Sequence, residues 1–295
     1  MQRIMRNYSH PQTLFSAFVA VLLGVMLAAT PSQAQDLGEL YAQARDVAQQ
    51  AQQAQQNQQH EEARDLYLDA YARILEFWEA GQEMEHEGAI EEGQRLAIRF
   101  QYRAGLMADA MEDYDSAITH FDNALEYDDQ HGRSWLGKAE AYRKSDRFEE
   151  GLEYYQLAME RGSSDTVQNA ENALRSNFHY LASSQLGQDE NVSRTAANQA
   201  LSYLEQMQEY ISANSSTYYY MAVANEALGN YAEAIDLATQ ALDIFSGSRT
   251  DQARIHLVRG EAHMAAGNNA EAREDLEAAQ VGDYAQRASA LLEQL

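Results

Sequence analysis

The chain has 295 residues, with 46 acidic against 21 basic side chains, a formal net charge of −25 and no cysteine. A surface this acidic repels nucleic acid and anionic lipid, so we expect no nucleic-acid partner, and stability has to come from packing instead of disulfides. Only two prolines occur, both before residue 32, so no later proline forces a helix to end.

Residues 1–34 have the pattern of an export signal. Arg3 and Arg6 precede an uncharged stretch whose apolar centre, 14–29, is shorter than the roughly 20 residues of a membrane-spanning helix. Small side chains lie at and near Ala34, where a signal peptidase requires them. We therefore expect cleavage after Ala34, no integral membrane span after cleavage, and a periplasmic or secreted protein. A retained amino-terminal anchor is the alternative.

The first stretch after the predicted signal is rich in glutamine and reads QQAQQAQQNQQ. Ala48, Ala51 and Ala54 nevertheless keep helical spacing through it. A helical hairpin is therefore expected at 36–80, and a flexible linker is the less favoured interpretation.

A pattern of small and aromatic residues repeats along the chain, with a period of 34 or 38 residues between its clearest copies and an earlier copy at Ala63, Tyr67 and Ala70. The clearest two copies align Ala117, Phe121 and Ala124 with Gly151, Tyr155 and Ala158. Later copies contain Ala234, Ala241, Ala272 and Ala279, and the helices that precede these segments contain Gly105, Trp135, Ala139 and Gly260. Small residues let two helices approach to about 8–10 Å while aromatic rings fill the space beside them. The pattern predicts stacked helical hairpins.

These residues and their spacing resemble the tetratricopeptide repeat family. The resemblance implies an all-α fold, a right-handed α-solenoid of about six helical hairpins with a C-terminal capping helix, forming one repeat domain over 35–295. The hairpins are expected, in chain order, at residues 36–80, 88–128, 131–161, 165–211, 215–246 and 250–281, followed by the cap at 283–295. Between 165 and 214 the period is distorted.

Motifs that carry chemistry are missing from the sequence. There is no HExxH, no GxSxG, no GxGxxG and no phosphate-binding GxxxxGK followed by serine or threonine, since the GxxxxGK at residues 132–138 is followed by alanine. His256 and His263 are the best candidate metal pair, but they align with Trp135 and Tyr142, which are expected to pack the hairpin. A structural zinc site also takes four ligands, and no cysteine exists to complete one. We therefore predict no catalytic residue, no cofactor and no metal.

The first helices of successive repeats in this family line a concave groove that receives an extended peptide or a helix. Mapped onto this chain, the resemblance implies groove positions at Arg99, Tyr102, Arg103, Arg133, Arg143, Tyr219, Tyr220 and Arg254. Arg95, Arg99 and Arg103 are four residues apart, which places them on one helix face. One hypothesis is that these arginines bind a carboxylate of the partner while the tyrosines hold its apolar part. The alternative is that the arginines pair with glutamates of adjacent helices and the tyrosines only pack. The lysine and asparagine set of the family's carboxylate-clamp members is not matched.

These features predict an exported bacterial scaffold or adaptor that binds a protein or peptide partner in the cell envelope. A second hypothesis is a structural subunit of an envelope complex that self-associates into a homo-oligomer through its glutamine-rich first hairpin. An enzyme carried on the repeats is a third hypothesis, which the missing motifs disfavour.

Overall fold

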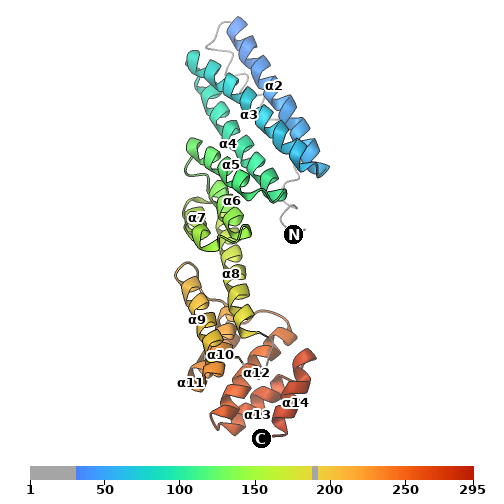
Figure 1. Ribbon diagram of the computed structural model, residues 1–295, viewed down its shortest axis with the longest axis vertical. Coiled ribbons are helices and arrows are strands. Elements are labelled where there is room, and N and C mark those ends of the chain that lie inside the picture. Colours follow the sequence, from blue (N-terminus) through green and yellow to red (C-terminus); the bar gives the residue numbers. More distant parts are fainter. Residues whose placement is uncertain (1–30, 188–191) are drawn as a thin grey trace. The chain divides into compact units, whose positions relative to one another are not determined.

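The structure, a computed structural model, describes residues 31–187 and 192–295, and every element within these ranges is a helix (Figure 1). The predicted signal peptide lies outside these ranges, except that residues 31–34 begin helix α2 (Pro31–Gln56). The chain divides into an N-terminal unit that ends at Ala170 and a C-terminal unit that begins at Glu171. The predicted all-α fold of helical hairpins with a C-terminal helix is confirmed.

The N-terminal unit is a series of antiparallel helices in which each helix contacts the next. Its helices after α2 are α3 (His60–Glu83), α4 (Glu87–Ala110), α5 (Tyr114–Tyr127), α6 (Gly132–Lys144) and α7 (Phe148–Arg161). The boundary between the two units falls within α8 (Ser164–Leu186).

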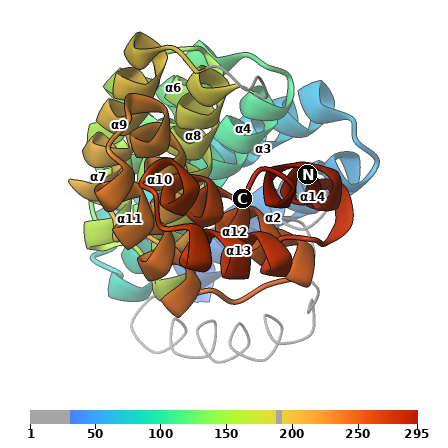
Figure 2. The same cartoon turned by 90° about the horizontal axis from the view of Figure 1, so that it is seen from below.

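The C-terminal unit continues the hairpin pattern. Its helices are α9 (Arg194–Gln208), α10 (Ser215–Leu228), α11 (Tyr231–Asp243), α12 (Arg249–Ala265), α13 (Asn269–Ala278) and, after a 3-10 turn at Gly282–Tyr284, α14 (Ala285–Leu292). Helix α13 contacts both α12 and α14, and Figure 2 shows these three helices side by side. Helix α14 thereby covers the last hairpin.

One residue with a left-handed backbone closes the turn inside several hairpins. Glu112 (φ 63°) and Asp146 (φ 60°) do so between α4 and α5 and between α6 and α7. Glycine takes the same place in the C-terminal unit, at Gly229 (φ 84°) and Gly267 (φ 82°), where the missing Cβ removes the steric penalty. The turn geometry therefore recurs although the residue type changes.

The interior is built from fully buried alanines with aromatic rings between them. Phe121 of α5 is 1% exposed and occupies a slot between α4 and α6. A Cβ added at Gly105 would lie 2.7 Å from this ring, and one added at Gly137 would lie 2.6 Å from it. Both distances are below van der Waals contact, so glycine is required on each side of the phenylalanine.

Each residue predicted to pack the repeats lies at a contact between helices. Fully buried are Ala117, Ala124, Ala139, Tyr155, Ala158, Ala234, Ala241, Ala272 and Ala279. Gly151 and Gly260 lie against Tyr142 and Leu276, respectively. Trp135 is half-buried: its ring stacks on Tyr154, and its indole nitrogen donates to the carbonyl of Asp129 at 2.8 Å.

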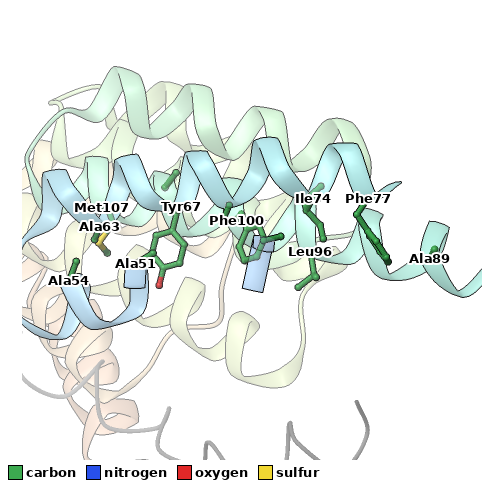
Figure 3. Packing of buried hydrophobic residues seen from close by; sticks show 14 of the residues in the cluster. Ala51, Ala54, Ala63, Tyr67, Ile74, Phe77, Ala89, Leu96, Phe100 and Met107 are labelled. Atoms are coloured by element: carbon green, nitrogen blue, oxygen red, sulfur yellow. The ribbon is translucent and has the colours of Figure 1, made fainter. Parts of the chain in front are cut away.

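The first hairpin has the same kind of core. Alanines of α2 and α3 are buried against larger side chains of α3 and α4, as Figure 3 shows for Ala51, Ala63, Tyr67 and Phe100. The rings of Tyr67 and Phe100 stack with centroids 6.5 Å apart. The glutamine-rich segment is therefore part of a packed helix, as its alanine spacing predicts.

Two hairpins have side chains of different chemical type at four equivalent positions. In α6 and α7 the positions contain Trp135, Lys138, Tyr142 and Tyr154. In α12 and α13, each 121 residues later, they contain His256, Arg259, His263 and Asp275. In the first set aromatic rings surround a lysine. The Lys138 ammonium lies 4.1 Å from the ring centre of Tyr154 and donates a hydrogen bond to Asp122 at 2.6 Å.

The second set is an ionic cluster centred on Asp275, whose side chain is 4% exposed. Arg259 donates to both of its carboxylate oxygens at 2.8 Å, and Nδ1 of His256 lies 2.9 Å from Oδ1. His263 lies farther away, with its Nε2 4.0 Å from Oδ2. Burial by itself raises the pKa of Asp275, but the hydrogen bonds from His256 and Arg259 lower it below its usual value.

We predict that Ala117→Leu destabilises the N-terminal unit by about 1–3 kcal/mol, because the larger side chain overpacks a fully buried helix contact. Ala232→Leu, at an exposed position of α11, is the matched control and should leave stability nearly unchanged. Thermal melting followed by circular dichroism measures both variants. An unchanged melting temperature for Ala117→Leu would contradict a close helix contact at this residue.

We also predict that Asp275→Asn destabilises the last hairpin by roughly 2–4 kcal/mol at neutral pH, because it leaves the Arg259 charge without its carboxylate. Since the pKa of Asp275 is lowered on folding, this stabilisation is complete above about pH 4 and is lost as the pH falls through the folded value. The variant and the parent should therefore converge in strong acid.

Urea unfolding at several pH values, with hydrogen exchange of α12 and α13, measures this effect. Glu274→Gln removes one charge at an exposed neighbour and serves as the control. A difference between Asp275→Asn and the parent that is the same at neutral pH and in strong acid would contradict the assignment.

Candidate binding faces of the two units

Three arginines of α4 form a stripe on one helix face: Arg95, Arg99 and Arg103. We call them the arginine stripe, and contacts at its two ends direct it toward α2. At one end, the Tyr41 hydroxyl of α2 donates to Oε1 of Glu92 at 3.2 Å, and the same carboxylate accepts from Arg95. At the other end, Nη1 of Arg103 donates to Oε1 of Gln55 in α2 at 3.3 Å.

Arg99, in the middle of the stripe, is half-buried. Within the described residues, no carboxylate lies within ion-pair distance of it. Burial lowers the pKa of Arg99, and the positive charges of Arg103 and Arg95 lower it further. The hydroxyls of Tyr67 and Tyr41 act in the opposite direction and raise the pKa of Arg99.

Several other cations of the N-terminal unit pair with acids outside their own helix. Four such ion pairs join α6, α7 and the loop between them to acids of α4, α5 and the loop after α5: Lys138–Asp122 (2.6 Å), Lys144–Asp109 (2.5 Å), Arg147–Asp115 (2.8 Å) and Arg161–Asp129 (3.1 Å). Arg95 pairs instead with Glu92 of its own helix. Within the described residues Arg95 thus pairs with a glutamate of its own helix, and Arg99 pairs with none.

Tyr102 and Arg133 occupy different environments on α4 and α6. The Tyr102 ring packs against Phe121, with centroids 5.9 Å apart, and against His131 at 5.4 Å. It therefore contributes to the contact between repeats as well as to the face predicted for binding. Arg133 is exposed at the start of α6.

Arg143 belongs to a closed polar group. Its guanidinium donates to Oε2 of Glu140 at 2.8 Å, and the Tyr155 hydroxyl donates to the other oxygen of that carboxylate. Tyr155 is fully buried, and burial followed by the charge of Glu140 raises its pKa. Because Arg143 already has an acidic partner, it is less available to a ligand than Arg99.

In the C-terminal unit the predicted residues form an aromatic and cationic cluster on α10 and α12. The guanidinium of Arg254 lies 4.6 Å from the ring centre of Tyr219 and donates to the Ser216 hydroxyl at 3.3 Å. Nε of Arg254 is buried and has no hydrogen-bond partner. The rings of Tyr219 and Tyr220 are 5.2 Å apart, and burial raises the pKa of Tyr219 to about 12.

His179 of α8 completes this cluster, and sequence reasoning missed it. Its ring lies 5.2 Å from that of Tyr220, and its Nε2 shares a 2.9 Å hydrogen bond with the Thr217 hydroxyl. Burial, followed by the charges of Arg175 and Arg254, lowers the pKa of His179 to about 4, so the ring is neutral at neutral pH. The distorted period between 165 and 214 conceals this histidine in the sequence.

The structure thus gathers the predicted groove residues into two sets. Arg99, Tyr102, Arg103, Arg133 and Arg143 belong to the N-terminal unit, and Tyr219, Tyr220 and Arg254 belong to the C-terminal unit. In the described ranges, no helix is long and apolar enough to cross a membrane. The same ranges contain no cluster of three or more His, Cys, Asp or Glu side chains placed to hold a metal ion.

Several solved structures resemble the chain at low identity. They include YrrB, a tetratricopeptide repeat protein with an unusual peptide-binding site (15% identity, 66% of this chain and 91% of that chain, TM-score 0.36). The TPR2AB domain of yeast Sti1 in a complex with an HSP90 peptide is 18% identical (85% and 98% covered, TM-score 0.36). A thermophilic tetratricopeptide repeat protein from Thermus thermophilus is 20% identical (66% and 99% covered, TM-score 0.29). A search of curated protein sequences found no match.

A family profile gives the more specific result. The tetratricopeptide repeat profile matches residues 102–166 and 229–290. The first match contains the hairpin α6–α7, and the second contains α11, the hairpin α12–α13 and most of α14. Both matched segments include the alanine and glycine positions on which the sequence resemblance depends. These two segments, which together make up less than half of the chain, are therefore similar to tetratricopeptide repeats.

Proposed function

We propose that the protein is a scaffold that holds a segment of a partner protein against the faces formed by its first helices. Tetratricopeptide repeats are protein-interaction modules, which gives the general class of function. The observation that carries the proposal is the chemistry of these faces. Arg99 is half-buried without a carboxylate, and Arg254 stacks on Tyr219 with a buried, unpaired Nε. Arginine and tyrosine are enriched where proteins bind one another.

We further propose that this binding takes place after export to the bacterial cell envelope. The basic start, apolar centre and small residues of 1–34 support this location. The acidic surface would keep such a protein soluble at high concentration. Catalysis forms no part of the proposal.

Site-specific photo-crosslinking in the bacterium that makes the protein tests the binding faces. A photoreactive phenylalanine analogue placed at Arg133 or Tyr220 should capture the partner, because both positions lie on first helices. The same group at Glu153 in α7 or Glu233 in α11, both exposed positions on second helices, should not. Adducts are separated by mass and identified by peptide sequencing.

Equal adduct formation at all four positions would contradict binding to the first helices. Adducts that contain only a second copy of this chain would instead favour the self-associating subunit.

The proposed export leads to a separate prediction about the amino terminus. The protein recovered from the periplasm or the medium should begin at Gln35, because cleavage is expected after Ala34. Intact-mass measurement and amino-terminal sequencing check this directly. A chain that keeps residues 1–34 and sediments with membranes would show that the segment acts as an anchor.

A further inference from the structure

We propose that the arginine stripe of α4 binds an extended acidic segment of the partner, with carboxylates on alternate residues. The inference rests on the proposed scaffold function and specifies the chemistry of what the N-terminal unit holds. The charge, burial and spacing of the stripe support it.

The charge of the stripe is unusual for this chain. Acidic side chains outnumber basic ones by more than two to one, yet within the described residues no carboxylate neutralises Arg99. Arg273, which also has no carboxylate partner in that part of the chain, is exposed, so water solvates its charge. Arg99 has lost part of this solvation through burial.

The neighbours of Arg99 add to the unfavourable charge. Arg95 and Arg103 lie one helical turn away on either side, and both positive charges oppose that of Arg99. Glu92 is already shared between Arg95 and the Tyr41 hydroxyl. An incoming anion would therefore gain attraction from all three arginines and would form charge-assisted hydrogen bonds with the Arg99 guanidinium.

The spacing of the stripe fits an extended peptide. Residues four apart on a helix rise by about 6 Å, whereas alternate residues of an extended chain are separated by about 6.6–6.8 Å. Successive carboxylates on one side of an extended segment therefore meet successive arginines.

A nucleic acid also presents regularly spaced anions, but the rest of the chain opposes it. The net charge of −25 repels a polyanion at long range, whereas a short peptide with a few carboxylates experiences much less repulsion.

Fluorescence anisotropy with the purified protein tests the proposal. The probes are a labelled short peptide with glutamate at alternate positions, the same composition with glutamate at every fourth position, a version with glutamine for glutamate, and a single-stranded oligonucleotide. The alternate-glutamate peptide should bind most tightly, and its affinity should fall as salt is raised.

Arg99→Gln should raise the Kd of this peptide about tenfold or more, through the loss of charge-assisted hydrogen bonds. Arg273→Gln makes the same change of charge at an exposed position and should leave the Kd unchanged. Without peptide, the melting temperature of Arg99→Gln should equal or exceed that of the parent, because a repulsive charge has been removed. This second measurement separates loss of binding from loss of folding.

Equal binding by Arg99→Gln and the parent would overturn the proposal. Tighter binding of the oligonucleotide, or of the peptide with glutamate at every fourth position, would overturn it too. If no peptide binds while photo-crosslinks still form at Arg133 and Tyr220, only the acidic-segment inference fails. If those crosslinks are also missing, the proposed scaffold function fails with it.

Discussion

The close approach of neighbouring helices at alanine and glycine is the contact on which the rest of the structure depends. Phe121 illustrates it, because the ring fits only where Gly105 and Gly137 present no Cβ. Such packing tolerates larger side chains poorly, since a protein interior is close-packed and relaxes only partly around a larger group. The small residues therefore determine where each helix lies, and the outer side chains are left to vary.

That freedom is visible at equivalent positions of two hairpins. The position of Tyr154, stacked under Lys138, is taken by Asp275 with Arg259 and His256 in the last hairpin. Both arrangements satisfy a partly buried cation, one with a ring face and one with a carboxylate. The same backbone contact supports either, because a small residue lies beneath these side chains in both copies: Ala139 and Gly151 in one, Gly260 and Ala272 in the other.

The distribution of charge separates structural from functional features. Lys138 of α6 pairs with Asp122, and Arg147, just before α7, pairs with Asp115 across a helix contact. An exposed pair such as Arg147–Asp115 contributes little by itself. Arg99 is different, because it is half-buried and surrounded by like charge. A repeat fold does not by itself specify a ligand, so the role proposed for Arg99 rests on this local departure from charge pairing.

The amino-acid sequence alone determined the helical hairpins, their repeat and the small residues at their contacts, because helical periodicity and residue size are local properties that a 34-residue repeat displays directly. It also placed Arg95, Arg99 and Arg103 on one face. Only the tertiary structure decided which arginine lacks a carboxylate, that Asp275 lies between Arg259 and His256, and that His179 joins Tyr220. Those contacts join side chains on different helices, and their distances depend on how each pair of helices packs.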